Sequence, residues 1–507
     1  MNTILKKIIP SQVNPIVVKE LRQAVRSRFV AGVFLLFLLV ELLGVGIGLA
    51  NSINHNYTIN YYTGRSIFHF LYIALSTACI LFIPSYAAIR LAMERWDSNL
   101  DLMYISTIKP AAIIRGKLFA TLAIALLLFS AAAPFMSFSY LLRGVDLPSI
   151  FIALAFIFIY VALLTQFMIF VACLPTSRAF KIVLGLVALS GLFQALVFVN
   201  IAGWAIIYEG FGSKIKDPDF LITAAISLAC GILGIGLIQR ISVALISPPT
   251  ANRSLPVRRY ATITWAITGI IVIACAGYYS DVDIIAAWLI PSVIFFALAI
   301  VWGLGEKTQL SLRVRHTIPK NPIKRRIAFL FYNGPAGALF WASTLTITTF
   351  IVAGISTTFI DGYIDGDQAE FGVIIANIFL YSVAYGLAGV SVWRLLLSKR
   401  ISSSAIGLIA CLLAVIGSIL PNIVAIITNS GSYWHSAWYI GNIFTVANQK
   451  HLYTHITFAF FFAIVMLACN GSWITNQMKN FIAPDNTQQD PDTNNTTSPH
   501  TDQTDAQ

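Results

Sequence analysis

Long runs of apolar residues, each bounded by a few polar or charged positions, recur along the whole chain. Twelve of these runs have the length, about 20 residues, that an α-helix needs to cross the hydrocarbon core of a bilayer. The pattern therefore predicts an all-α integral membrane protein, a polytopic bundle of helices. The predicted spans are residues 29–50, 66–89, 118–140, 149–174, 182–208, 220–246, 261–279, 284–304, 338–359, 371–393, 402–428 and 452–473.

The composition strengthens this interpretation. Of the 507 residues, 58% are hydrophobic and only 11% are charged, a balance that excludes an ordinary soluble domain. The net charge of +12 comes from Lys and Arg residues dispersed over short loops. It therefore indicates membrane topology and contact with anionic lipid rather than binding of nucleic acid. The six cysteines all lie in apolar runs without metal-ligand spacing, as small buried residues do.

The Lys and Arg positions also predict the orientation of the bundle, because basic residues concentrate on the cytoplasmic side of membrane proteins. With both termini inside, the only basic residues left in external loops are Arg65, Arg143, Lys214, Lys216 and Lys450. We therefore expect a cytoplasmic N-terminus (1–28), a six-span module (29–246), a second six-span region (247–479) and a disordered cytoplasmic tail (480–507).

The N-terminal segment contains a predicted amphipathic helix. Asn14 followed by Pro15 is a typical helix start, with Asn as the N-cap and Pro at the first helical position. The helix that follows has an apolar face and a basic face, formed by Val18, Leu21 and Val25 and by Lys19, Arg22 and Arg26. This pattern predicts an interfacial helix on the cytoplasmic leaflet.

The stretch Arg90–Lys117, between the second and third predicted spans, is too polar to span the membrane and too long for a tight turn. Its five basic residues place it on the cytoplasmic side. Leu100, Leu102 and Met103 lie among polar residues in the pattern of a helix at the membrane surface. Pro110 then marks the approach to the next span.

Two strings in this first half resemble the type-2 ABC export permeases, the membrane subunits of ABC transporters. The string N-P-x-x-x-K-E-L-R, which begins at Asn14, resembles the elbow helix of that family. The family's coupling segment reads roughly E-R-E-x-G-T-L-E-L-L, then T-P, then G-K. The residues that resemble it are Glu94-Arg95, Leu100-Asp101-Leu102-Met103, Ser106-Thr107, Pro110 and Gly116-Lys117. The chain departs from the segment at Trp96, Ser98-Asn99 and Ile108-Lys109. The resemblance covers about residues 14–246.

The resemblance implies a role for each matching residue. In the family, the coupling helix docks on a separate cytoplasmic ATPase. The residues that correspond to it here are Glu94, Arg95, Leu100, Leu102, Met103, Gly116 and Lys117. The residues that correspond to the elbow helix are Asn14, Pro15, Lys19, Glu20 and Arg22. The resemblance also implies an ABC ATPase partner that binds ATP-Mg, a second permease that is identical or homologous, and a bacterial inner membrane with its lipids.

We therefore expect the permease subunit of an ABC-type export system. The chain has no G-x-x-x-x-G-K-[ST] phosphate loop and no catalytic motif, so we expect neither an enzyme nor a cofactor or metal site in this chain, and ATP hydrolysis in a partner. A twelve-span secondary carrier, a scaffold of an envelope complex and a membrane enzyme stay open as alternatives. A carrier needs ionisable residues within its spans, and an enzyme needs a cluster such as the carboxylates of residues 361–370.

Glu41 is the one carboxylate clearly inside a predicted span. A charge there is costly unless it is paired, protonated or hydrated. Glu41 therefore lies near a translocation path, or it is a neutral acid bonded to a neighbouring helix or a contact to a lipid headgroup. Gly44, Gly46 and Gly48 follow it and allow close approach of another helix. Hydrogen bonds between helices are expected from the other polar residues within or at the ends of spans: Gln166, Gln194, Asn200, Asn377 and Asn422.

The most basic loop, residues 305–337, lies between the eighth and ninth predicted spans. The stretch Arg90–Lys117 has the corresponding place between the second and third. This arrangement is compatible with a degenerate six-plus-six repeat, although the second loop lacks the string of residues found in the first.

Overall fold

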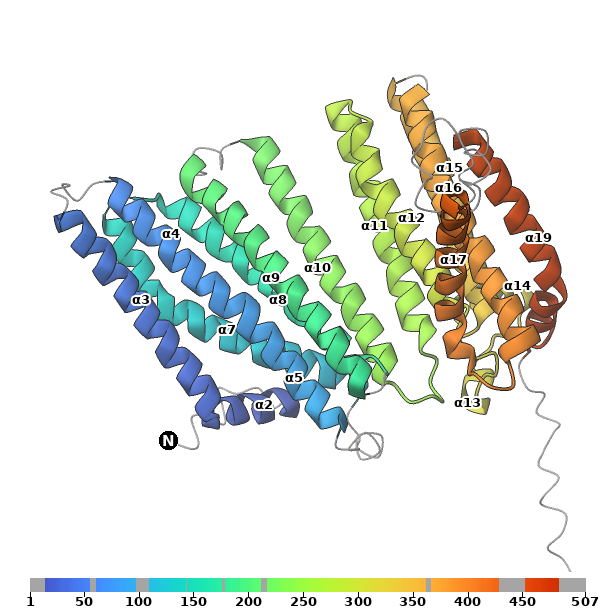
Figure 1. The fold of residues 1–507 in the computed structure, drawn as a ribbon, viewed down its shortest axis with the longest axis horizontal. Coiled ribbons are helices and arrows are strands. Elements are labelled where there is room, and N and C mark those ends of the chain that lie inside the picture. The colour runs from blue at the N-terminus through green and yellow to red at the C-terminus, as the bar shows by residue number, and fades with distance from the viewer. Residues whose placement is uncertain are drawn as a thin grey trace, which may run out of the picture. The chain divides into compact units, whose positions relative to one another are not determined.

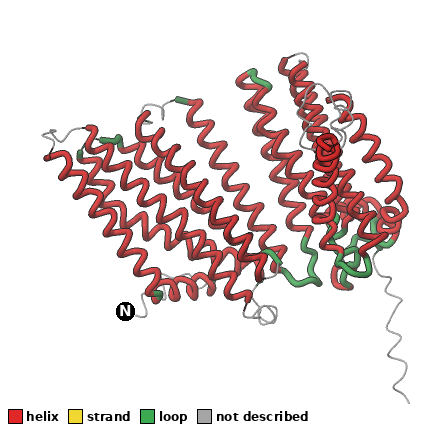
Figure 2. The backbone as a smooth tube through the Cα atoms, viewed as in Figure 1, coloured by secondary structure: helices red, strands yellow, loops and turns green. Residues whose placement is uncertain are grey.

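The computed structural model describes residues 14–54, 61–96, 109–142, 144–175, 178–210, 217–361, 366–427 and 452–482. Within these ranges the chain forms helices joined by turns and short connections, without a strand (Figures 1 and 2). Eleven of these helices are long and apolar enough to cross a membrane. The chain is therefore an all-α, multi-pass membrane protein, as the pattern of apolar runs predicts.

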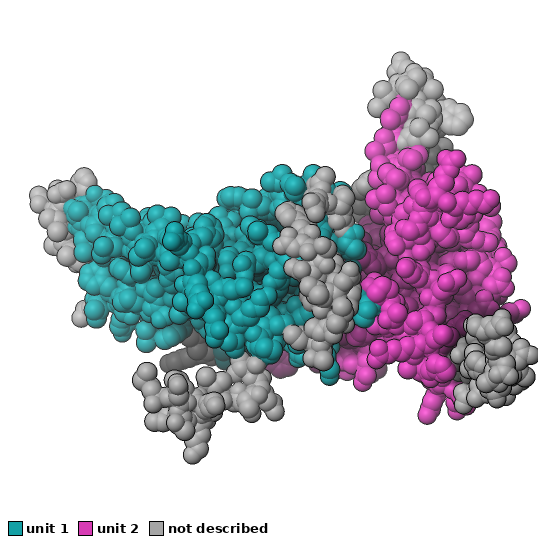
Figure 3. All heavy atoms as spheres, turned by 90° about the horizontal axis from the view of Figure 1, so that it is seen from below, with its two compact units in different colours: residues 1–248 teal, residues 249–507 magenta. Residues whose placement is uncertain are grey.

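The helices belong to two compact units, Met1–Pro248 and Pro249–Gln507, which Figure 3 colours separately. The division lies close to residue 246, where the sequence places the end of the first six-span module. Each unit is described by itself below.

Unit 1 consists of one short helix that lies across the end of several long helices (Figure 1). The short helix is α2 (Pro15–Arg26). The others are α3 (Arg28–Asn54), α4 (Tyr61–Thr77), η1 (Ala78–Phe82), α5 (Ile83–Trp96), α7 (Pro110–Leu141), α8 (Leu147–Cys173), α9 (Arg178–Glu209) and α10 (Pro218–Ile246). The elements α4, η1 and α5 follow one another without a break, and η1 is a π-helical segment between the two α-helices.

The core of unit 1 forms around α4. Phe68, Leu71, Tyr72 and Leu75 of this helix are completely buried and pack with side chains from α7, α8 and α9. From α3, Phe37 joins the same core, whereas many large apolar side chains of that helix are exposed. An exposed apolar face of this extent is expected on a helix that contacts lipid.

Two helices of unit 1 extend further than the predicted spans. The span predicted at 66–89 continues as helix to Trp96, and the span predicted at 118–140 begins at Pro110. The stretch Arg90–Lys117 is therefore helical at both ends, as the last turns of α5 and the first turns of α7. Its middle, residues 97–108, lies outside the described residues. The predicted spans stop at Arg90 and Lys117, whereas the helices continue past these charges.

Unit 2 contains the remaining helices. They are α11 (Ser254–Tyr279), α12 (Asp283–Gly303), α13 (Leu312–Arg315), α14 (Pro322–Phe331), α15 (Pro335–Asp361), α16 (Gly366–Val392), η3 (Trp393–Leu397), η4 (Ser403–Ala405), α17 (Ile406–Ile427) and α19 (Leu452–Lys479). The predicted span 402–428 corresponds to α17. This helix of 22 residues is apolar.

Short helix α14 of unit 2 has the same start as α2. Asn321 caps it through its side chain, and Pro322 is the first helical residue. Like α2, it is amphipathic and directly precedes a long apolar helix, here α15. Loop 305–337 therefore contains a local counterpart of the N-terminal amphipathic helix.

Candidate functional site

Helix α2 begins where the sequence predicts. The Asn14 side chain is the N-cap: its Oδ1 accepts a hydrogen bond from the N–H of Ile16 at 3.1 Å, and Pro15 is the first helical residue. The Nδ2 of Asn14 also donates to the carbonyl oxygen of Ala112 on α7 at 2.6 Å. The capping residue therefore fixes the start of α2 and its position on α7 together.

Gly116 allows α2 to lie directly against α7. A Cβ atom at this position would be only 2.9 Å from Cβ of Ile16, closer than non-bonded carbon atoms approach one another. Any larger residue would therefore push the two helices apart. The close approach brings the polar side chains of α2 within reach of those on α5 and α7.

Five charged side chains join α2, α5 and α7. The Nζ of Lys117 on α7 lies 2.7 Å from Oε1 of Glu20 on α2 and 2.8 Å from Oε2 of Glu94 on α5. The Nζ of Lys19 lies 3.2 Å from Oε1 of Glu94, and Nη2 of Arg90 lies 3.8 Å from Oε2 of Glu20. We call these five residues, with Asn14 and Gly116, the α2 junction.

Burial differs strongly within the α2 junction. The side chains of Lys117 and Glu20 are 3% and 7% exposed, whereas those of Lys19 and Glu94 are 56% and 32% exposed. A buried charge that loses its partner is strongly destabilising, by about 3–5 kcal/mol, whereas an exposed ion pair contributes about 0–1 kcal/mol. The inner pair Lys117–Glu20 therefore holds the junction together.

The junction also explains why α5 and α7 continue past Arg90 and Lys117, the charges that bound the two predicted spans. Arg90 pairs with Glu20 and donates to the side-chain oxygen of Gln23, and Lys117 pairs with two carboxylates. Because Glu20 of α2 balances their charges, Arg90 and Lys117 can lie within the packed helices α5 and α7. Burying a charge is acceptable when it is paired and hydrogen-bonded.

Most of the residues singled out by the two sequence strings meet at this junction: Asn14, Pro15, Lys19, Glu20, Glu94, Gly116 and Lys117. The resemblance assigns Gly116 and Lys117 to ATPase coupling, but both lie under α2 and contact this chain itself. Arg22 is exposed on α2. The side chain of Arg95 and residues Leu100, Leu102 and Met103 lie outside the described part, as does part of the acidic loop 361–370.

Glu41 is completely buried on α3. Neither oxygen of its carboxylate has a hydrogen-bond partner among the residues that the structure describes. Of the three glycines that follow it, two face α4: a Cβ at Gly44 would meet the ring of Phe70, and one at Gly48 would meet the side chain of Ile67. The predicted close approach of another helix is confirmed for these two positions.

Two of the polar residues expected to bond between helices do so. The Nε2 of Gln166 on α8 donates to Oγ of Ser242 on α10 at 3.3 Å. The Oγ of Ser76 on α4 donates to Oδ1 of Asn200 on α9 at 2.9 Å. Asn377 instead donates to a carbonyl oxygen of its own helix, and it forms no bond to another helix within the described residues. The side chain of Asn422 lies outside the described residues.

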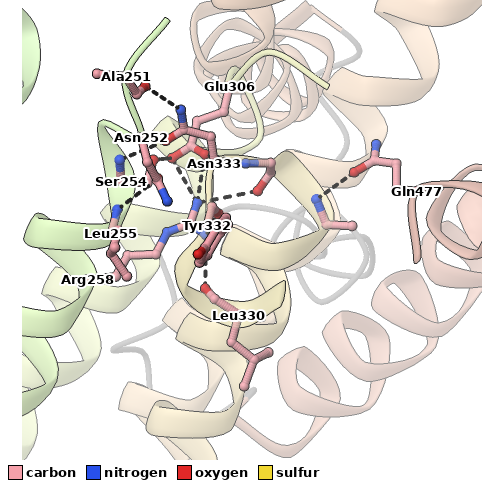
Figure 4. A network of polar contacts seen from close by, with 12 residues as sticks. Ala251, Asn252, Ser254, Leu255, Arg258, Glu306, Leu330, Tyr332, Asn333 and Gln477 are labelled. Carbon is pink, nitrogen blue, oxygen red and sulfur yellow. Dashed lines mark hydrogen bonds and ion pairs between the residues drawn. The ribbon is translucent and has the colours of Figure 1, made fainter. Parts of the chain in front are cut away.

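Unit 2 has a polar junction that sequence reasoning did not identify (Figure 4). Arg258, buried near the start of α11, places Nη2 2.8 Å from each carboxylate oxygen of Glu306. Its Nη1 donates to the carbonyl oxygens of Leu330 at 2.9 Å and Tyr332 at 2.7 Å. The N–H of Gly334 donates to Glu306 Oε2 at 2.7 Å. The start of α11, the end of α12 and the end of α14 are thus tied together.

The signal for this second junction in the sequence is weak. Arg258 and Glu306 lie just outside two predicted spans, where charged residues are expected for reasons of topology alone. Their pairing depends on the packing of α11 beside α12, which no local pattern reports.

Neither a family model, nor a curated protein, nor a solved structure matches this chain.

Proposed function

We propose that this chain is the membrane-spanning permease subunit of an ABC-type export system, driven by a separate cytoplasmic ATPase in a bacterial inner membrane. The observation that supports the proposal best is the α2 junction. Residues 97–108, where the resemblance places the docking helix, connect α5 to α7. Both of these helices are held to α2 through Lys117, Glu20 and Glu94.

This arrangement suits the transmission of movement. A displacement of residues 97–108 would move the end of α5, the start of α7 and α2 together, because they share a buried ion pair. Through α5 the movement would reach η1 and α4, the centre of the unit 1 core. Short π-helical segments such as η1 often occur at functional sites of helices. We propose that these elements act as a lever that shifts the bundle between inward-open and outward-open arrangements.

The proposal divides the residues of the coupling string into two groups. Glu94, Gly116 and Lys117 hold the lever on α2, as their contacts indicate. Arg95, Leu100, Leu102 and Met103 contact the ATPase. The partner binds ATP-Mg and hydrolyses it, this chain performs no catalysis, and a second permease completes the transporter.

The test is to purify the tagged full-length protein gently from its own membrane and to identify the proteins that accompany it. The variant Leu102→Asp places a charge where an apolar contact with the ATPase is expected. Its matched control is Leu312→Asp, because Leu312 is an exposed apolar residue and, like Leu102, belongs to a loop predicted on the cytoplasmic side. We expect a P-loop ATPase with the wild type and the control, and its loss from Leu102→Asp.

Absence of a P-loop ATPase from the wild type, under conditions that preserve a known ABC complex, would refute the proposal. The secondary carrier would then be the next candidate, since Glu41 is a buried carboxylate without a partner among the described residues. A single such group gives this alternative less support than the whole α2 junction gives the permease.

A further inference from the structure

Helix α14 of unit 2 presents an apolar stripe between two basic side chains, and we propose that this surface binds the headgroups of anionic phospholipids. The α14 surface consists of Ile323, Lys324, Arg326 and Ile327. The inference does not depend on the proposed transport function, because the residues, their contacts and their charges all belong to unit 2.

The two faces of α14 differ in their surroundings. Ala328 and Phe329 pack on the small core formed by Val314, Ile318, Tyr332 and Phe481. Ile323 and Ile327 are 69% and 54% exposed and lie one turn apart on the same side of the helix. At 3.6 residues per turn, Lys324 and Arg326 flank this pair on either side. An apolar stripe between two long basic side chains is typical of a helix that lies in a membrane interface.

The position of α14 in the fold places it at a membrane face. It ends at Phe331, and the candidate span α15 begins at Pro335, only a few residues later. The same end of unit 2 contains the start of α11 and the end of α12, which the Arg258–Glu306 pair joins to α14 (Figure 4). A short helix so close to the ends of three spans lies where the headgroups are.

The α14 surface is also held in place before any ligand binds. Arg258 fixes the last turn of α14 through its bonds to the carbonyl oxygens of Leu330 and Tyr332. The hydroxyl of Tyr332 in turn donates to the carbonyl oxygen of Thr317, just after α13, at 2.9 Å. Because the surface is pre-organised, little ordering entropy opposes binding.

The charges on this part of unit 2 are not balanced by the described chain. The segment 307–360 contains no Asp or Glu, and Glu306 is already occupied by Arg258, Ser254 and Gly334. The basic residues of the loop are Lys307, Arg313, Arg315, Lys320, Lys324, Arg325 and Arg326, and none forms an ion pair with a described residue. At the α2 junction, by contrast, Lys19, Arg90 and Lys117 face two carboxylates. The α14 surface therefore has no anionic partner among the described residues, and a bound anion would balance its charges.

Anionic lipid fits this surface better than the chain's own acidic tail does. Residues 484–507 contain five Asp residues, but no Val, Ile, Leu, Met, Phe, Tyr or Trp that would cover the apolar stripe. A phospholipid offers both parts at once: a phosphate for Lys324 and Arg326, and the start of its acyl chains for Ile323 and Ile327. A soluble phosphate would satisfy only the basic pair.

The experiment measures thermal unfolding of the purified full-length protein in neutral detergent micelles that contain phosphatidylcholine and rising fractions of phosphatidylglycerol. A ligand that binds the folded state raises its unfolding temperature, which yields an apparent affinity. The variant Lys324→Gln/Arg326→Gln should weaken phosphatidylglycerol binding roughly ten- to thirtyfold, given what each basic residue contributes near an anionic membrane. The charge-conserving Lys324→Arg/Arg326→Lys should bind as the wild type does.

Two further variants separate the charge of the surface from its shape. Ile323→Gln/Ile327→Gln keeps every charge but removes the apolar stripe, and it should also lose the preference for phosphatidylglycerol. Lys399→Gln/Arg400→Gln removes two exposed charges elsewhere in unit 2. It should weaken phosphatidylglycerol binding less than Lys324→Gln/Arg326→Gln does. All these positions are exposed, so unfolding in phosphatidylcholine alone should match the wild type and show that the variants are folded.

Three results would overturn the proposal. One is an equal loss of phosphatidylglycerol affinity in Lys324→Gln/Arg326→Gln and Lys399→Gln/Arg400→Gln. That result would show that only the net charge of the protein matters, and not the position of the charges. Another is stabilisation of the wild type by inorganic phosphate as strong as that by phosphatidylglycerol, which would identify a soluble anion as the ligand. The last is an unchanged lipid response together with loss of a co-purifying protein from Lys324→Gln/Arg326→Gln, which would identify a protein partner.

Discussion

Replacing Lys117 by methionine is the sharpest test of the α2 junction. Methionine has a similar length and no charge, so the change removes the ammonium group and keeps most of the apolar volume. Glu20, only 7% exposed, then keeps Arg90, whose Nη2 is 3.8 Å from its carboxylate, as its nearest cation. Glu94 keeps Lys19 at 3.2 Å.

The expected loss of stability follows from the burial of the pair. Breaking a buried ion pair by removing one partner costs about 3–5 kcal/mol where the other charge stays buried, and Arg90, 3.8 Å from the Glu20 carboxylate, compensates that charge only in part. The matched control Lys19→Met breaks an exposed pair and should cost at most about 1 kcal/mol. For a unit of this size, we expect Lys117→Met to lower the unfolding temperature by roughly 6–20 °C.

The assay is thermal unfolding in one detergent, with Glu20→Gln and the double variant Glu20→Gln/Lys117→Met completing a double-mutant cycle. The double variant should be less destabilised than the sum of the single changes, since it also removes the Glu20 charge that Lys117→Met leaves without its lysine partner. Equal effects of Lys117→Met and Lys19→Met, or strict additivity in the cycle, would refute the reasoning.

Two further predictions concern the packing of α2 and the junction of unit 2. Gly116→Val should separate α2 from α7, since a Cβ there would lie 2.9 Å from that of Ile16; protease cleavage within α2 should become faster, and an unchanged cleavage rate would contradict the close packing. Arg258→Lys should lower the unfolding temperature of the protein although it keeps the charge, because lysine cannot bond Glu306 and the carbonyl oxygens of α14 at the same time. An unfolding temperature identical to that of the wild type would show that the several donors of the guanidinium group are not needed.

Features that depend on neighbouring residues were predictable from the sequence. Runs of apolar residues are a local property, and they sufficed for the all-α membrane class and for most of the spans. The start of α2 was predictable for the same reason, since Asn14 caps the helix through its own side chain and Pro15 fixes the first turn. The ends of α5 and α7 were not, because local reasoning treats Arg90 and Lys117 as charges that must leave the membrane.

Tertiary structure alone decided which charges are balanced. Lys117 and Glu20 are 97 positions apart in the chain, and Arg258 and Glu306 are 48 apart. The sequence contains both partners of each pair. They come into contact only because the helices that carry them pack together, and that packing depends on many residues between them in the chain. The sequence therefore determined where helices form and which residues are polar. Packing determined which polar residues hold this chain together and which, as on α14, have no ion-pair partner among the described residues.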